Sequence, residues 1–423
     1  MQIHHPHSAS PVHESPPWSQ GEKYFNAQMH RDAEHSVGQA SRLSPSARPC
    51  PTARLAISEV RDRRDACPTT HRTSDLGFRA SFAIRHSSFV ILPLLACLLF
   101  SALPTLAAPA RIKLATVAPT GSAYHKSLLK LRDEWRKLSD GSVDLVIYAD
   151  GKLGGESDTV GLMSVNSLQA AMLTAVGLGG IEKGVEGLQS IPMGFRTLAA
   201  VDYVGAKLQP MLEERLLKKG FVVLAWSDAG WVRFFSREPL RTPDELKKMK
   251  LFTWSGNPEL LDIYKSSGFR PVPLETADIV PSLQTGLIDV LPTPPVFALA
   301  TQIDTRAPHM LDLNWGPLVG AIVVRKEAWE KLPVELRPKL LAAARQTGQE
   351  IRNSGRQESA DSVKAMEKRG LKVTPVTPEM EAQWRVAAEA VYPQIRGRIV
   401  PADIFDRALE LIKEHQSLPP KAE

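Results

Sequence analysis

After residue 110, short segments with strand periodicity alternate with longer segments of helical periodicity, and this alternation constrains the fold more than any other feature. Strand-like patterns cover residues 111–117, 142–148, 170–173, 221–226, 232–236, 250–254, 271–274, 287–291, 311–313 and 371–374. Helical patterns cover residues 122–138, 157–164, 258–267, 276–283, 338–369, 377–395 and 401–415; further helices are expected to end at 219–220 and to begin at 242–245. Strands and helices in alternation predict an α/β fold with mixed or parallel sheets.

The predicted strands fall into two groups, with a second unit beginning near Trp231. Several connections between the groups predict two hinged lobes. We expect lobe I to hold residues 110–231 with about 319–345, and lobe II to hold residues 232–318 with about 346–423. A cleft between such lobes is the expected place for a small ligand, and lobe closure would be a hinge motion about the crossing strands.

Residues 1–88 differ from the rest of the chain. They contain most of the histidines, are rich in Pro, Ser and Arg, and have no sustained apolar period, so they cannot bury enough surface to offset the entropy of an ordered chain. We interpret them as a disordered leader or as a gene-model artefact upstream of the true translation start. The closely spaced His4, His5 and His7 match no closed metal site.

Residues 89–108 form an uncharged apolar run that follows Arg79, Arg85 and His86 and ends in small residues. This pattern is typical of a secretory signal peptide, which we place at 89–109, and it predicts export to the periplasm. A retained membrane anchor and a lipoprotein cleavage site at Cys97 remain alternatives. All three cysteines lie at or before residue 97, so the exported part has no disulfide or thiolate site.

The composition excludes several classes of function. A formal net charge of +6 over 423 residues is too small and too evenly spread to indicate nucleic-acid binding. The chain has no H-E-x-x-H, G-x-S-x-G or P-loop motif. We therefore predict a non-enzymatic protein without cofactor or metal, although a catalytic site assembled from scattered residues is not excluded by motifs alone.

Four segments in the later chain carry a family resemblance. Residues 149–156 read Ala-Asp-Gly-Lys-Leu-Gly-Gly-Glu, residues 242–250 read Thr-Pro-Asp-Glu-Leu-Lys-Lys-Met-Lys, and residues 283–289 read Leu-Gln-Thr-Gly-Leu-Ile-Asp. The fourth is Phe-Val-Val-Leu-Ala-Trp at 221–226, followed by Gly-Trp at 230–231. The first three resemble, respectively, the "G-x-LG-x-E", "TPxDLKGxK" and "LQTGxxD" segments of the solute receptors of TRAP transporters, the extracellular solute-binding proteins related to the dicarboxylate receptors. The fourth also fits this family, and along the chain all four occur in the family's order.

The resemblance implies a two-lobed periplasmic binding protein fold with a ligand cleft between the lobes and a long helix backing both. It also implies capture of a small organic ligand, expected to be acidic, and its delivery to integral membrane TRAP transporter subunits. Contact with the membrane would then occur only through that permease. Two other functions stay open: an exported ligand sensor for a membrane receptor, and an exported enzyme on a similar scaffold.

The chain departs from the family at the residue that usually binds a substrate carboxylate. The family places an arginine in the strand after "LKGxK", whereas Phe252 follows Lys250 and Leu251 here. Phenylalanine cannot supply the oriented, charge-assisted hydrogen bonds of a guanidinium. Arg233, from the preceding strand, is a candidate replacement, but a shift of one residue along a strand turns a side chain to the opposite face.

Aromatic residues near strand ends are the next candidates for the cleft. We expect Trp231 and Trp254 to form apolar walls that bind a planar or apolar ligand, or else to belong to the core. Trp315 and its neighbour Asn314 are expected at the edge of the cleft, whereas Trp226 is expected in the core.

Three polar residues complete the predicted site. Asn257 can contact the ligand or cap the following helix. Glu156 can accept hydrogen bonds from a ligand or stabilise the positive end of a helix. His125 follows the turn after the first strand and is either a ligand contact or a structural, solvated side chain.

Overall fold

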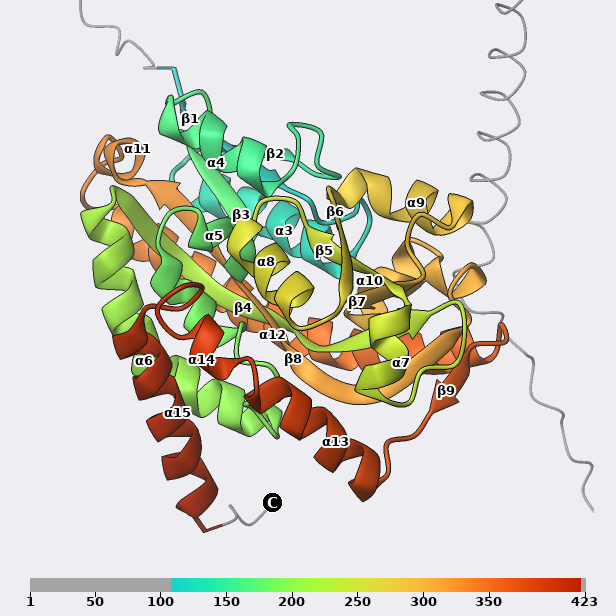
Figure 1. Ribbon diagram of the computed structural model, residues 1–423. Helices are drawn as coiled ribbons and strands as arrows, with labels where there is room; N and C mark the ends of the chain where they lie inside the picture. The colour runs from blue at the N-terminus through green and yellow to red at the C-terminus, as the bar shows by residue number, and fades with distance from the viewer. Residues whose placement is uncertain (1–107, 420–423) are drawn as a thin grey trace, which may run out of the picture. The chain divides into compact units, whose positions relative to one another are not determined.

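The computed structural model describes residues 108–419, which lie in the unit that runs from Leu92 to Glu423 (Figure 1). The predictions for residues 1–88, and for the signal peptide at 89–109 apart from its last two residues, fall outside the described residues. In the described part of the chain, no helix combines the length and apolar character needed to cross a membrane.

The described strands form one nine-stranded mixed sheet. Its order is β2-β1-β3-β8-β4-β7-β5-β6, and β9 pairs with β8. The strands are β1 (Ala110–Thr116), β2 (Val143–Tyr148), β3 (Ala170–Thr174), β4 (Phe221–Ser236), β5 (Lys250–Trp254), β6 (Arg270–Leu274), β7 (Val290–Thr293), β8 (His309–Arg325) and β9 (Lys372–Thr374).

Two long antiparallel strands, β4 and β8, connect the two halves of this sheet (Figure 1). The last part of β8 pairs with β3, which joins the parallel strands β1 and β2 to it. The last part of β4 pairs with β7, which joins the parallel strands β5 and β6. Each half carries its own helices and core, so the two-lobed α/β fold predicted from the sequence is confirmed.

Helices cover both faces of the sheet, and several begin at the residues that the sequence indicates. The α-helices are α3 (Ala123–Leu138), α4 (Glu156–Ser164), α5 (Ala175–Gly179), α6 (Leu198–Lys218), α7 (Pro243–Lys248), α8 (Pro258–Ser266), α9 (Ile279–Thr285), α10 (Pro295–Ala300), α11 (Lys326–Glu330), α12 (Arg337–Glu367), α13 (Pro378–Glu389), α14 (Tyr392–Ile395) and α15 (Ala402–Ser417). The 3-10 helices are η2 (Lys183–Leu188), η3 (Thr276–Asp278) and η4 (Ile303–Thr305). Thr242 and Glu245 form a reciprocal capping box that starts α7.

The long helix α12 packs along β4 and contributes to the cores of both lobes. Leu340, Ala344 and Ile351 belong to a core cluster that includes residues of β1 and β2. Met366 belongs to another cluster, which includes residues of β5 and β7. Close approach to the strand depends on glycine, because a Cβ on Gly348 would lie 2.7 Å from both the Cβ of Ala225 and the carbonyl oxygen of Trp226. The predicted helix backing both lobes is confirmed.

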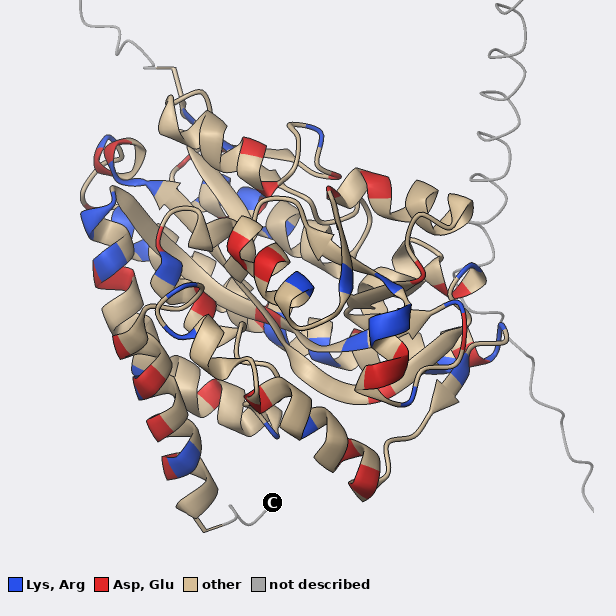
Figure 2. Ribbon diagram, viewed as in Figure 1, with Lys and Arg blue, Asp and Glu red and all other residues tan. Residues whose placement is uncertain are grey.

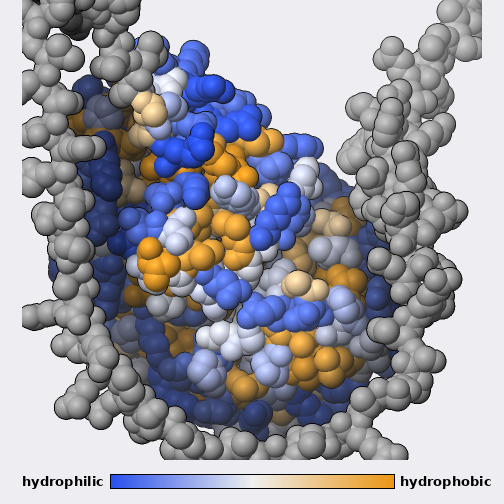
Figure 3. Space-filling view, turned by 90° about the horizontal axis from the view of Figure 1, so that it is seen from above, coloured by the Kyte–Doolittle hydropathy of each residue, from blue (hydrophilic) through white to orange (hydrophobic). Residues whose placement is uncertain are grey.

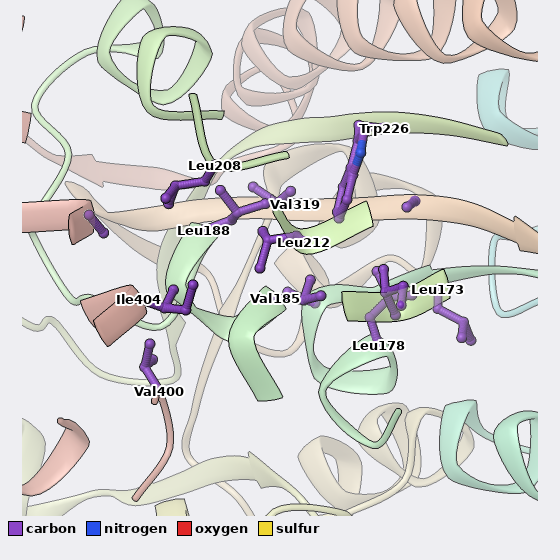
Figure 4. Close-up of a cluster of buried hydrophobic side chains, with 14 of the residues drawn as sticks. Leu173, Leu178, Val185, Leu188, Leu208, Leu212, Trp226, Val319, Val400 and Ile404 are labelled. Carbon is purple, nitrogen blue, oxygen red and sulfur yellow. The ribbon is translucent and has the colours of Figure 1, made fainter. Parts of the chain in front are cut away.

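The largest core cluster lies in the first half of the sheet and includes C-terminal residues (Figure 4). Trp226 is buried in it, as predicted, and its indole N–H donates to Glu213 at 2.9 Å. Val400 and Ile404 pack in the same cluster, and α15 lies against α6. We propose that residues 402–417 belong with lobe I; the other lobe boundaries stay as predicted from the sequence.

The sequence patterns predicted β4 as two separate strands and only a short part of β8, whereas both are continuous in the structure. Segments 221–226 and 232–236 belong to the single strand β4, and 311–313 is part of the 17-residue strand β8. Register shifts in the pairing of β4 with β8 absorb the intervening residues, and Gly230 takes a positive φ of 74° at one of them. A bulge therefore occupies a position that has the composition of a turn.

The surface of the described residues is mixed in charge and polarity. Basic and acidic side chains are interspersed over the helices and strands (Figure 2). Apolar patches on the face seen from above are interrupted by hydrophilic side chains (Figure 3). The large exposed apolar residues lie on separate elements rather than in one patch.

Candidate functional site

A cavity of about 220 Å³ lies where the two halves of the sheet meet. Lobe I lines it with Val117, Thr174, Val176, Glu186, Gln189, Ser190 and Pro192. Lobe II lines it from β5, β7 and the segments between them, and the crossing strands add Val232, Phe234 and residues 315–318. Because side chains from both lobes and from the hinge strands line one cavity, it corresponds to the predicted cleft.

Aromatic side chains form much of the cavity wall. Phe252 meets Trp254 edge-on, with ring centroids 5.1 Å apart. Trp315 packs edge-on against Phe234 at 5.3 Å and against Trp384 at 5.9 Å. Of the predicted residues, Trp254 and Trp315 therefore lie in the lining, and so does Phe252, which stands where the family resemblance implies an arginine.

Two threonine hydroxyls in the lining are buried without a hydrogen-bond partner among the described residues. Thr253, on β5, is 3% exposed, and Thr276 starts η3. Neither hydroxyl is accessible from the cavity, and Thr253 alternates along β5 with Phe252 and Trp254, so these two hydroxyls are not oriented toward a ligand. Asn257 also lines the cavity; its Oδ1 caps α8 by accepting from the backbone N–H of Leu260 at 2.9 Å, which leaves its Nδ2 to face other partners.

Glu186 is an acidic residue of the lining that the sequence did not single out. It lies on η2, is 4% exposed, and accepts a hydrogen bond from the hydroxyl of Ser190. Gly179 makes room for it, because a Cβ at that position would lie 2.7 Å from Oε1. Burial raises the pKa of Glu186 to about 7, and the charge of Glu156 acts in the same direction.

Among the described residues, the cavity lining contains no Lys, Arg or His. Arg233 points away from it: Val232 and Phe234 line the cavity, and side chains alternate between the faces of a strand. On the opposite face, the Nε of Arg233 donates to Asp312 at 2.8 Å and its Nη1 donates to the Oδ1 of Asn314. Burial lowers the pKa of Arg233, and the charge of Asp312 opposes that shift. The prediction that Arg233 replaces the family arginine gains no support from this geometry.

Glu156 lines a second cavity of about 140 Å³, which shares Val117, Thr174, Pro294, Phe297 and Leu318 with the first. Its carboxylate accepts from the backbone N–H and hydroxyl of Thr174 at 2.7 and 2.6 Å, and from the backbone N–H of Gly177 at 3.0 Å. These bonds fix the start of α5, so Glu156 stabilises a helix other than the one on which it lies. Burial raises the pKa of Glu156 despite these bonds.

The remaining predicted residues lie outside the lining of both cavities. The Nδ1 of His125 accepts from the backbone N–H of Gly121 at 3.1 Å, which is a local structural contact. Trp231 packs against the core of lobe I, and Asn314 contacts Arg233 behind the strand. A ligand role for His125, Trp231 or Asn314 is therefore a prediction without support from their positions.

An ionic cluster around the buried carboxylate of Asp228 holds the crossing region to α12. Arg356 donates to Asp228 from Nε at 2.8 Å and from Nη2 at 2.7 Å, and to both oxygens of Asp202 at 2.7 and 2.9 Å. Arg352 lies 3.4 Å from Asp202 and 4.0 Å from Asp228. Asp228 is on β4 beside the bulge and also accepts from the backbone N–H of Gly230. The cluster thus joins α6, β4 and α12 close to the point where the strand passes between lobes.

The family model of the bacterial extracellular solute-binding proteins, family 7, matches residues 114–397. The chain belongs to this family. That match confirms the resemblance drawn from the sequence motifs. The family members and the structural neighbours are binding proteins rather than enzymes.

Characterised relatives share the fold and about a quarter of the sequence. The C4-dicarboxylate-binding periplasmic protein DctP of Rhodobacter capsulatus is 24% identical over 301 residues, covering 70% of this chain and 89% of that protein. Among solved structures, a TRAP periplasmic solute-binding protein of Ralstonia eutropha H16 with bound (S)-2-acetolactate is 22% identical with a TM-score of 0.67, covering 72% of this chain and 99% of that one. A TRAP periplasmic solute-binding protein of Sulfurospirillum deleyianum with bound succinate is 22% identical with a TM-score of 0.66, covering 74% and 100%.

Replacing Trp254 by alanine is expected to weaken ligand binding by about tenfold or more while lowering stability only slightly. Trp254 is partly exposed and lines the cavity, so part of its ring is available to a ligand, although it also packs on Phe252 and on a core cluster of lobe II. Isothermal titration with a bound solute, alongside denaturant unfolding, measures both effects. The matched control is Trp135→Ala: Trp135 is fully buried in lobe I, and its loss is expected to cost about 3–5 kcal/mol of stability with affinity unchanged. A Trp254→Ala variant that behaves like the control would place Trp254 in the core.

Proposed function

We propose that this solute-binding protein is the periplasmic receptor of a TRAP-type transporter, which captures a small organic ligand between its lobes and delivers it to membrane permease subunits. One observation carries the proposal: a single cavity lined by both lobes and by the two strands that connect them. A ligand held there contacts both lobes at once, so binding favours the closed arrangement.

The cavity's position supports capture, and family membership supports delivery. Relatives of the chain bind small acids, such as the succinate bound by the Sulfurospirillum deleyianum protein. The family resemblance in the sequence likewise implies an acidic ligand for this chain. Export follows from the same proposal, with the run at 89–109 acting as the signal peptide. Contact with the membrane would occur only through the permease.

A thermal-unfolding screen against organic acids, keto acids, aromatic acids and their uncharged analogues tests the capture step. A ligand that binds only the folded state stabilises it by RT ln(1 + [L]/Kd), about 2.7 kcal/mol at a hundredfold excess over Kd. We expect at least one compound to raise the unfolding midpoint and to reduce the radius of gyration in solution scattering as the lobes close.

The alternatives give different results in the same experiments. Turnover of any compound without a stable complex would favour an exported enzyme. Binding and closure without uptake, when the protein is reconstituted with its membrane subunits in vesicles, would favour a sensor. Ligand-dependent uptake in that system is the result expected of a transport receptor.

A further inference from the structure

We propose that the cleft recognises an uncharged, largely apolar ligand, aromatic or branched aliphatic, whose polar end is a neutral hydrogen-bonding group rather than an ionised carboxylate. The inference rests on the proposed function, because it names the ligand class of the same cavity. Two features of the lining carry it: the absence of basic side chains among the described residues, and the aromatic walls.

An ionised carboxylate finds no partner in this cavity. Its lining has no Lys, Arg or His within residues 108–419. Arg233 pairs with Asp312 at 2.8 Å on the far face of β4, and Lys183, whose charge acts on Glu186, pairs with Glu259 at 2.7 Å. An anion taken from water into an apolar site without a paired cation is strongly disfavoured, and buried Glu186 supplies no positive charge.

A fully charged ammonium finds little compensation either. Glu186 is the one acid in the main lining of the described chain, and one of its oxygens is already bonded to Ser190. Glu156, in the adjoining cavity, already accepts three bonds that hold α5. With the pKa of Glu186 near 7, that carboxyl is largely or partly protonated around neutral pH and serves as a neutral donor or acceptor.

The size and walls of the cavity fit an apolar ligand. An apolar cavity of ~150 Å³ accepts benzene, so about 220 Å³ holds a ring or a branched chain with a few further atoms. Phe234, Phe252, Trp254 and Trp315 present aromatic surface to such a body.

Asn257 and Glu186 define where the neutral polar end would bind. The Oδ1 of Asn257 accepts from the backbone N–H of Leu260, so its Nδ2 is the atom left to donate to a ligand, and the carboxyl of Glu186 is bonded to Ser190 through one of its oxygens. An amide N–H donates, and a protonated carboxyl donates and accepts, so a ligand hydroxyl, carbonyl or amide pairs with them without introducing a charge.

Matched ligand trios test the inference directly. Isothermal titration of the purified protein at pH 6, where Glu186 is mostly protonated, would compare phenylacetate, 2-phenylethanol and 2-phenylethylamine, and then isovalerate, isoamyl alcohol and isoamylamine. Within a trio the apolar body is constant and only the charge changes. We expect the alcohol to bind at least tenfold more tightly than the carboxylate and than the ammonium in at least one trio.

The other outcomes are separable. A carboxylate or an ammonium that binds most tightly overturns the inference and leaves the proposed receptor function intact. Binding of acids from the screen without binding of either alcohol would also overturn the inference and leave the proposed receptor function intact. No binding by any acid, alcohol or amine counts against the receptor function itself, and against the inference with it.

A variant that supplies the missing cation isolates the role of charge. Val232 lines the cavity from β4, and Val232→Arg would place a guanidinium there. We expect the ratio of carboxylate to alcohol affinity to rise at least tenfold, whereas the uncharged control Val232→Met keeps the original preference. Val232→Lys serves if the arginine variant does not fold. A folded cationic variant whose ratio is unchanged would show that charge does not set the selectivity, which contradicts the inference.

Discussion

Replacing Arg356 by methionine is expected to lower the free energy of unfolding by about 3 kcal/mol, the lower end of what loss of one partner from a buried ion pair costs. Arg356 supplies four hydrogen bonds to Asp202 and Asp228, and Asp228 is 6% exposed. Without the guanidinium, Asp228 is a buried carboxylate with only Arg352, 4.0 Å away, as a cation. That remaining neighbour is the reason for placing the expected loss at the lower end.

The matched control is Arg396→Met, because Arg396 makes an equally direct pair with Asp406 on the surface. Exposed pairs contribute little, since water and salt screen them and ordering two long side chains costs entropy. Denaturant unfolding of both variants gives the comparison. Equal stability of the two variants would mean that the Asp202–Asp228–Arg356 cluster is no more important than a surface pair.

The fold was largely predictable because local and long-range signals agree in this sequence. Ser122 and Thr242 cap helices where polar residues precede apolar periodicity, and the long pattern at 338–369 corresponds to α12 (Arg337–Glu367). The continuity of β4 was not predictable. Its residues 228–230 have the composition of a turn, and a positive-φ glycine serves a turn and a β-bulge equally well.

The candidate site was predictable only in part, for a related reason. Trp254 ends β5, Asn257 caps α8, and Trp315 follows the predicted strand at 311–313, although it lies inside β8; the structure puts all three in the lining. The face occupied by Arg233 depends on the bulges that precede it, and no sequence pattern counts them. Glu186 looks like an ordinary surface acid in a Gly-rich segment; only packing against Gly179 and Ser190 shows that it is buried.

The Glu186→Gln variant is expected to gain stability relative to the wild type as the pH rises from about 4.5 to about 7. The pKa of Glu186 is about 7 in the folded protein and near its ordinary value of 4.5 in the unfolded chain. Between these values the folded state holds a proton that the unfolded state releases, so rising pH favours unfolding of the wild type. A shift of this size corresponds to about 3 kcal/mol, lost across that window and constant above it. Glutamine keeps the acceptor for Ser190 but does not titrate. The stability of the Glu186→Gln protein therefore does not decrease for this reason between pH 4.5 and pH 7.

Denaturant unfolding from pH 4.5 to 8 measures the difference between the two proteins, which is expected to widen by about 3 kcal/mol in favour of Glu186→Gln. Ser190→Ala provides an independent control of the cause. The Ser190 hydrogen bond lowers the pKa of Glu186 against the effect of burial, so its removal should raise that pKa further. The Ser190→Ala protein should therefore continue to lose stability up to a higher pH than the wild type does. A difference curve that stays flat with pH would mean that Glu186 is not buried in the folded protein in solution. In that case the cavity would contain an ordinary ionised carboxylate, and a cationic ligand would become the better expectation for the cleft.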